Sequence, residues 1–305
     1  MLLFLEQVLN GLQFGVMLFM LAAGLTLIFG IMGLINLAHG SLYMVGAFAA
    51  ASVLAVTGSF LLAVLGGMVA AGLAGLLIES AIMRRLYARG HLDQVLATFG
   101  LILFFNEFVR MVWGPRPLYL DIPSWLAGTV EIFPGAGYPL YRLAIIAVGL
   151  AIAAGLWWLV QRTRLGMLLR AGAADREMVA ALGVNTTRLY AGVFVLGAVL
   201  AGLAGALAGP LFTVEVGMGE HILIQTFVVI VIGGIGSIRG ALVGALLVGM
   251  VDTLGRAYLP SLLRLVAEPA TADGVGSALA SMLIFVLMAA VLIWRPRGLL
   301  PAHGH

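Results

Sequence analysis

The sequence consists largely of long apolar runs, and these constrain the fold more than any other feature. The first, residues 11–35, contains no charged residue and exceeds the roughly 20 residues that a helix needs to cross a bilayer. Eight more follow, at residues 42–56, 60–83, 93–113, 143–160, 189–207, 222–232, 240–254 and 278–294. Because backbone polar groups in lipid must be satisfied internally, such runs form helices. We predict an all-α, polytopic helical membrane protein with eight or nine transmembrane helices, built as a single transmembrane domain over residues 1–305.

The composition excludes several other classes of protein. Only 10% of the residues are charged, against roughly a quarter in soluble domains, and the short connections leave no room for a soluble catalytic domain. The chain has no Cys, and neither His39 nor His221 has a second ligand at metal-binding spacing. Sequence motifs of metalloproteases, serine hydrolases and P-loop proteins are also missing. We therefore expect no catalytic site, cofactor or metal, and no binding of nucleic acid.

A polar interruption separates the first two apolar runs. Asn36, His39, Gly40 and Ser41 lie there, and we predict a broken or re-entrant segment near residues 32–45. Non-helical backbone at membrane depth is tolerated where it is buried in protein or lines a cavity, and interrupted spans often mark transport sites. These four residues are therefore candidates for lining a translocation pathway. A tight turn at the membrane surface is the alternative.

Glycine-rich stretches in the second half of the chain predict close helix packing. Ala201, Gly205 and Gly209 follow one another at intervals of four, as do Gly240 and Gly244, and small residues at this spacing let helices approach closely. The sequence GGIGS at residues 233–237 lacks the Lys of a phosphate-binding loop. It predicts a closely packed or re-entrant backbone instead.

A charge-dense segment, residues 162–188, interrupts the apolar chain near its middle. It contains five Arg and two acids, Asp175 and Glu177. Its Ala-rich part predicts a short helix over 173–182, with both acids in the first turns and stop signals at Gly183 and Asn185. Met178, Val179 and Leu182 form an apolar stripe on this helix. The segment is interpreted as a docking helix outside the bilayer or, alternatively, as a solvated basic loop that only fixes orientation.

The distribution of Arg predicts how the chain is oriented. Ten of the 16 Arg lie in three clusters, at 84–89, 162–188 and 295–297, and the positive-inside rule places all three in the cytoplasm. The number of spans between the clusters agrees with this placement. The Pro-rich segment 114–140 and the N-terminus then lie outside the membrane.

Six ionisable residues fall in or near predicted spans, and such groups are candidates for function by default. They are His39, Glu79, Glu107, Glu220, His221 and Asp252. Most lie at predicted span ends, where an interfacial position explains them. Proton-coupled transport requires acids facing each other in mid-membrane, so this distribution argues against a secondary transporter.

The sequence resembles one known family from end to end. GLTLIFGIM at residues 24–32 followed by INLAHG at residues 35–40 resembles the opening of branched-chain amino acid ABC transporter permeases. The pattern RA at 170–171, DREM at 175–178 and ALGVN at 181–185 resembles their cytoplasmic coupling loop. GGIGS at 233–237 with GA at 240–241, and WRPRGL at 294–299, resemble their late glycine motif and terminus. The opening and the coupling loop together are the specific part of this resemblance.

The resemblance implies a transmembrane permease subunit of an ATP-driven importer in a bacterial inner membrane. The substrate would be a branched-chain or related hydrophobic amino acid, delivered from outside by a periplasmic binding protein. The partners would be a homologous second permease and two cytoplasmic ATPase subunits, which hydrolyse the ATP. An amide or urea importer of the same family, and a non-ATP secondary carrier or channel, remain open.

The same resemblance implies roles for individual residues. Residues 162–188 would be the cytoplasmic coupling loop, with the apolar side chains Met178, Val179 and Leu182 entering a groove of the ATPase. The charges of Arg170, Asp175 and Arg176 would orient this contact. Further coupling residues match the family core of Glu-Ala-Ala-x-x-Gly, although its spacing is shifted here: Glu177, Ala180, Ala181 and Gly183. Asn36, His39, Gly40 and Ser41 would line the pathway.

Overall fold

The computed structural model describes residues 2–87, 89–133, 136–265 and 268–301, and these residues are overwhelmingly helical. The elements in chain order are α1 (Leu2–Met32), α2 (His39–Thr57), α3 (Phe60–Ile78), the π-helical turn η1 (Glu79–Met83), α4 (Arg84–Leu86), α5 (His91–Trp113), the 3₁₀ turn η2 (Ser124–Leu126), β1 (Thr129–Phe133), β2 (Ala136–Pro139), α6 (Leu140–Arg162), α7 (Arg164–Ala174), α8 (Arg176–Ala181), α9 (Thr186–Ala208), α10 (Met218–Gly233), α11 (Ile238–Leu263) and α12 (Pro269–Trp294).

The span count predicted from the sequence is confirmed at eight. Within the described residues, eight helices are long and apolar enough to cross a membrane, and α10 is a shorter apolar helix. The apolar run at residues 222–232, the seventh of the nine, is therefore not a full span. The segment near 32–45 is broken as predicted, but α1 and α2 on either side of it both have the length of a span.

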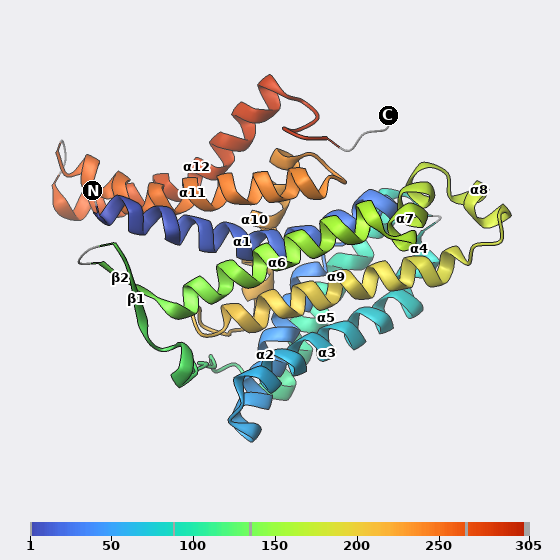
Figure 1. The fold of residues 1–305 in the computed structure, drawn as a ribbon, viewed down its shortest axis with the longest axis horizontal. Helices are drawn as coiled ribbons and strands as arrows, with labels where there is room; N and C mark the ends of the chain where they lie inside the picture. The colour runs from blue at the N-terminus through green and yellow to red at the C-terminus, as the bar shows by residue number, and fades with distance from the viewer. Residues whose placement is uncertain (1, 88, 134–135, 266–267, 302–305) are drawn as a thin grey trace.

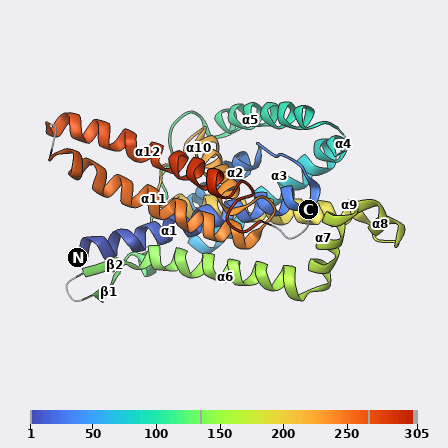
Figure 2. The ribbon, with the colours of Figure 1, turned by 90° about the horizontal axis from the view of Figure 1, so that it is seen from above.

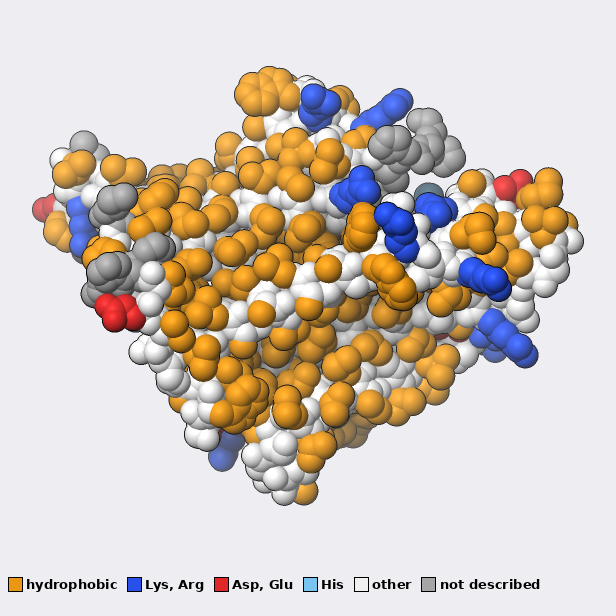
Figure 3. Space-filling model, viewed as in Figure 1, with side chains coloured by type: hydrophobic (Ala, Val, Ile, Leu, Met, Phe, Trp, Pro, Cys, Tyr) orange, Lys and Arg blue, Asp and Glu red, His pale blue; other side chains and the backbone are white. Residues whose placement is uncertain are grey.

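The long helices run mostly lengthwise between two distinct ends of the molecule (Figures 1 and 2). One end, here called the Arg-rich end, carries α4, α7 and α8 together with the Arg clusters. The other, called the hairpin end, carries the N-terminus and the antiparallel strands β1 and β2, whose pairing brings Thr129 opposite Pro139. A broad apolar surface lies between the two ends on the face shown in Figure 3. This pattern of charged ends and an apolar middle fits a membrane-spanning bundle.

Three helices form the centre of the bundle and others form its periphery. About 78% of the apolar window of α1 is buried, with 72% for α9 and 61% for α2, whereas α12 reaches only 17%. Two of these central helices, α2 and α9, meet each other and α3 at small residues. A β-carbon added at Gly202 of α9 would lie 2.7 Å from the carbonyl oxygen of Gly67 in α3, and one added at Gly46 of α2 would lie 2.7 Å from that of Gly202. The three backbones therefore touch at one level of the bundle.

The predicted close contacts of the later glycines are confirmed. A β-carbon added at Gly205 would overlap the carbonyl oxygen of Tyr43 in α2. Gly240 of α11 packs against Gly233 at the end of α10, and a β-carbon at Gly244 would lie 2.5 Å from the carbonyl oxygen of Val229. After α12 the chain returns to this point, where Leu299 and Leu300 donate backbone hydrogen bonds to residues 232 and 233. GGIGS is thus a tightly packed corner at the Arg-rich end.

Two helices begin deep inside the bundle rather than at its surface. Residues 33–38 turn back after α1, and the Nε2 atom of His39 lies 3.2 Å from the carbonyl oxygen of Leu21, about 16 Å along α1 from Met32. The first residues of α2 and α10 then meet, because the backbones of Gly40 and Gly219 are in direct contact. The link from α9 to α10 starts at the hairpin end, where Val214 forms an antiparallel β-bridge with Leu118 of the Pro-rich segment.

The helix contacts at Gly202 give a direct test of the packing. We expect Gly202→Val to destabilise the bundle by about 1–3 kcal/mol, because its β-carbon would overlap α3. The matched control is Gly155→Val in α6, where an added β-carbon meets nothing within 4 Å. The measurement is the apparent Tm of the detergent-solubilised protein. A lower Tm for both variants alike would contradict the proposed role of the contact.

Candidate functional site

The charge-dense segment forms two short helices that meet at Asp175. The sequence predicted one helix over 173–182 with Asp175 in its first turn, and this is corrected by the structure: α7 ends at Ala174 and α8 starts at Arg176. Asp175 adopts an extended backbone, and its carboxylate accepts a hydrogen bond from the backbone N–H of Met178 at 2.9 Å. An Asp at this position caps a helix better than it continues one, which explains the break.

The end of α8 is fixed by a Schellman motif. The backbone N–H of Val184 donates to the carbonyl of Val179 at 3.3 Å, and that of Gly183 donates to the carbonyl of Ala180 at 3.0 Å. Gly183 has a φ of +85°, a left-handed conformation that glycine adopts without steric cost. The stop signal predicted at Gly183 is confirmed. Asn185, predicted as a second stop signal, instead caps the start of the next helix by accepting from the N–H of Arg188 at 3.0 Å.

The apolar stripe predicted on this helix is divided between two faces. Met178 is 58% exposed and Leu182 is 76% exposed, whereas Val179 is only 5% exposed. Val179 therefore anchors α8 to the protein, and the two outer side chains point away from it. Exposed apolar side chains on a capped helix that projects from the Arg-rich end (Figure 1) leave a surface suited to contact with another protein.

The other predicted coupling residues lie around this exposed surface. Glu177, Ala180, Ala181 and Asp175 are exposed. The guanidinium of Arg170, on α7, donates to the carbonyl of Val160 in α6, so it ties α7 back to the preceding span. The side chain of Arg176 lies outside the described residues.

The four predicted pathway residues lie together at the start of α2 and are all buried. Gly40 packs on the backbone of Gly219. His39 reaches the carbonyl of Leu21 through Nε2, while its Nδ1 and both polar atoms of the Asn36 side chain make no hydrogen bond to the described protein atoms. The polar interruption is therefore an internal junction of α1, α2 and α10. Its role in the pathway remains a prediction.

Three of the acids singled out from the sequence are paired with Arg on the same helical segment. Glu79 is fully buried and lies 3.0 Å from Arg84. Asp252 lies 2.9 Å from Arg256, and Glu107 lies 2.7 Å from Arg110. Each pair neutralises a carboxylate within or next to the apolar region, where an unpaired charge is costly. These acids therefore have structural partners.

Glu220 differs from these acids, and the sequence did not indicate its position. It was expected at a span end, but it lies in the first turn of α10, and its carboxylate accepts a hydrogen bond from the side-chain amide of Asn106 in α5. The signal that could have found it is the shortness of the apolar run 222–232. A helix too short to span begins or ends inside the membrane, and because α10 ends at the GGIGS corner, its first turn is the part that lies inside.

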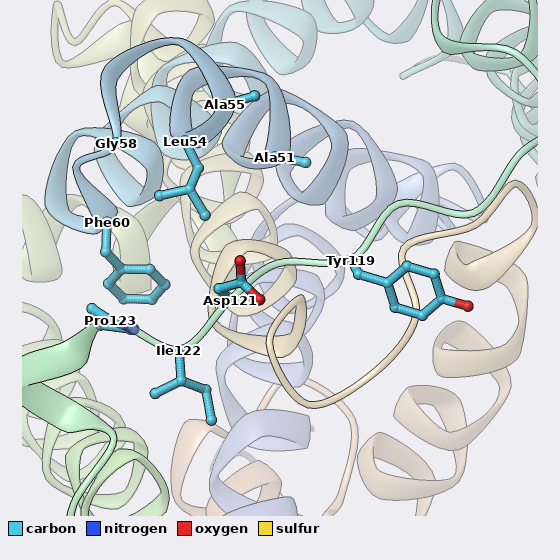
Figure 4. A pocket seen from close by; sticks show the side chains of 9 residues that line it. All are labelled: Ala51, Leu54, Ala55, Gly58, Phe60, Tyr119, Asp121, Ile122 and Pro123. Carbon is cyan, nitrogen blue, oxygen red and sulfur yellow. The ribbon is translucent and has the colours of Figure 1, made fainter.

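A separate pocket lies at the opposite end of α2 from Gly40. It has a volume of about 420 Å³ and is bounded by the end of α2, Phe60 and residues 119–123 of the Pro-rich segment. Asp121 is the charged residue in the lining of this pocket. Tyr119 points away from the other labelled side chains (Figure 4). The pocket is formed by the hairpin-end surface and lies apart from α8.

Comparison with known proteins shows the family to which this chain belongs. The family described as "Branched-chain amino acid transport system / permease component" matches residues 7–292. The chain belongs to this permease family. The match covers the internal junction at Asn36–Ser41, the charge-dense segment and the GGIGS corner, which are the regions that carried the resemblance seen in the sequence.

Relatives with this description match the permease over most of its length. The high-affinity branched-chain amino acid transport system permease protein LivH of Salmonella typhimurium and that of Escherichia coli K12 are each 33% identical over 271 residues, 84% of this chain and 87% of theirs. BraD of Pseudomonas aeruginosa, with the same description, is 31% identical over 311 residues, 97% of this chain and 95% of its own. No solved structure matches the permease. The chain is thus a multi-pass membrane permease component of a transport system.

The cap of α8 gives a test of the local structure of the permease. We expect Gly183→Ala to cost about 1–2 kcal/mol, because a β-carbon is strained in the left-handed region. Gly192→Ala, in α9, is the matched control, since the added β-carbon meets nothing within 4 Å and Ala favours a helix. Amide hydrogen exchange measured over residues 176–185 should rise in the first variant alone. Unchanged exchange in Gly183→Ala would contradict the Schellman motif.

Proposed function

We propose that this chain is a transmembrane permease subunit of an ATP-driven importer in a bacterial inner membrane. The importer carries branched-chain or related hydrophobic amino acids into the cytoplasm. The relatives LivH and BraD are described as permeases for branched-chain amino acids, and the family match over residues 7–292 supports the same role. The Arg-rich end is then cytoplasmic, and the Pro-rich segment 114–140 lies outside.

In this proposal energy comes from partners. A homologous second permease completes the membrane part, two cytoplasmic ATPase subunits bind and hydrolyse ATP, and a periplasmic binding protein delivers the substrate at the hairpin end. The chain itself has no catalytic role. A binding protein would contact the surface that carries the pocket between α2 and the Pro-rich segment.

The observation that carries the proposal is the capped helix α8 with its two exposed apolar side chains. Met178 and Leu182 would enter a groove of the ATPase, as an amphipathic helix does in helix-in-groove recognition. Val179, which is buried, would transmit the movement of α8 into the bundle instead of entering the groove. Arg170, Asp175 and Arg176 would set the register of the contact through their charge.

Two alternatives retain the permease fold but change the reaction. An amide or urea importer would use the same coupling region, and only the substrate would differ. A secondary carrier or channel would have no use for an exposed apolar helix at the cytoplasmic end, and the pairing of Glu79, Asp252 and Glu107 with Arg leaves these acids poorly suited to carry protons.

Transport by reconstituted vesicles tests the proposal directly. We expect uptake of labelled leucine to require ATP, the ATPase subunits, the second permease and a binding protein, and to stop when any one of them is omitted. Competition by an amide or urea distinguishes the second substrate class. Uptake driven by a pH gradient without ATP would contradict the importer.

Substitution on α8 tests the coupling. We expect Met178→Asp to abolish co-purification with the ATPase subunits, because a charge would have to be buried in an apolar groove. Met178→Leu keeps the apolar surface, and Ala174→Asp adds the same charge at an exposed site on α7. Both controls should retain the ATPase subunits. Normal co-purification of Met178→Asp would exclude this contact.

A further inference from the structure

One carboxylate of the membrane region lacks the Arg partner that its counterparts have. Glu220 is exposed on the surface of this chain, and its hydrogen-bond partner is the neutral amide of Asn106. The ion pairs formed among the described residues do not include Glu220. Glu107, which follows Asn106 in α5, is already paired with Arg110 at 2.7 Å.

Helix lengths place this pair well inside the membrane. Glu220 follows Gly219, whose backbone contacts Gly40, and the adjacent His39 reaches Leu21, about 16 Å along α1 from its end at Met32. Asn106 lies about 22 Å along α5 from His91 and about 10 Å from Trp113. Because the hydrocarbon layer is about 30 Å thick, the two helices independently place the pair within it.

The Glu220–Asn106 pair lies among apolar side chains on the exposed surface of this chain. Leu103 and Phe104 on α5 and Ile224 on α10 are all more than half exposed. An ionised carboxylate facing lipid at this depth is costly, and acids in membrane spans almost always face protein or a water-filled cavity. We therefore infer that the face formed by α5 and the start of α10 is directed toward a neighbouring subunit and the water beside it, rather than toward lipid.

We propose that Glu220, held in place by Asn106, lines the translocation pathway and binds the ammonium group of an amino acid in transit. The proposal rests on the importer function proposed above, with the second permease opposite this face. The ammonium supplies the positive charge that an Arg supplies to Glu79, Glu107 and Asp252. A charge-assisted hydrogen bond of this kind is stronger than a neutral one, so the site favours amino acids over neutral amides and urea.

The position of Glu220 can be tested without any transport. The chain has no Cys, so single Cys substitutions give an unambiguous labelling signal. We expect Glu220→Cys in the assembled complex to react with a water-soluble thiosulfonate reagent, because thiol reaction requires the thiolate and hence water. Leu150→Cys, at an exposed position in the middle of the peripheral helix α6, should not react. Equal protection of the two would overturn the pathway location.

The charge is tested by Glu220→Gln, which preserves the size and the hydrogen bond to Asn106. We expect the coupling ratio, which is the number of leucine molecules transported per ATP hydrolysed, to fall about tenfold. This corresponds to about 1.4 kcal/mol, and assembly and ATP hydrolysis should continue. Glu220→Asp should restore part of this coupling ratio. Glu107→Gln makes the same chemical change at the Arg-paired acid of α5 and should leave the ratio unchanged.

The outcomes separate this proposal from the importer function. If the wild-type complex shows no ATP-dependent leucine uptake, the importer proposal fails, while the labelling result still reports where Glu220 lies. If the wild type transports leucine and Glu220→Gln has the same coupling ratio, the importer stands and the ammonium site is wrong. A loss of assembly in Glu220→Gln but not in Glu220→Asp would show that the carboxylate joins subunits instead of binding substrate.

Discussion

The direct contact of helix backbones at small residues is the constraint on which the structure depends. In lipid there is little hydrophobic gain when two apolar helices meet, so van der Waals contact and close approach determine which helices pack. At Gly46, Gly67 and Gly202 a single β-carbon would force the helices apart. Gly40 and Gly219 repeat this contact at the starts of α2 and α10. The position of both interrupted helices thus follows from glycine packing.

In the proposed importer, the two interrupted helices α2 and α10 connect the glycine packing to transport. Because α10 begins within the bundle, its first turn carries Glu220 into the membrane, next to Asn106 of α5. The buried residues Asn36 and His39 lie next to the Gly40–Gly219 contact at the start of α10. A movement of α2 against α10 would change both places together. In the proposed importer, α8 receives the movement of the ATPase at one end, and this junction lies between α8 and the hairpin end.

Much of the charge-dense segment 162–188 could be predicted from the sequence, because its signals are local. Asp175, Gly183 and Asn185 act through hydrogen bonds to residues within five positions along the chain, and the stop at Gly183 was predicted correctly, whereas Asn185 was predicted as a stop but caps the start of α9. The extent of the helix was predicted wrongly at Asp175, where capping of α8 prevailed over continuation from α7. The inward direction of Val179 could not be predicted, since it depends on how α8 packs against the protein.

The sequence alone is enough to predict a multi-pass helical membrane protein, the side of the membrane on which the Arg clusters gather and the places where the helices are interrupted. Those properties depend on hydropathy, charge and local backbone preference. The tertiary structure was needed to show that α2 and α10 begin at one backbone contact, Gly40 against Gly219, and that Asn106 of α5 is the hydrogen-bond partner of Glu220. These properties depend on which segments lie side by side, and in a bundle this is set by contacts between residues far apart in the chain.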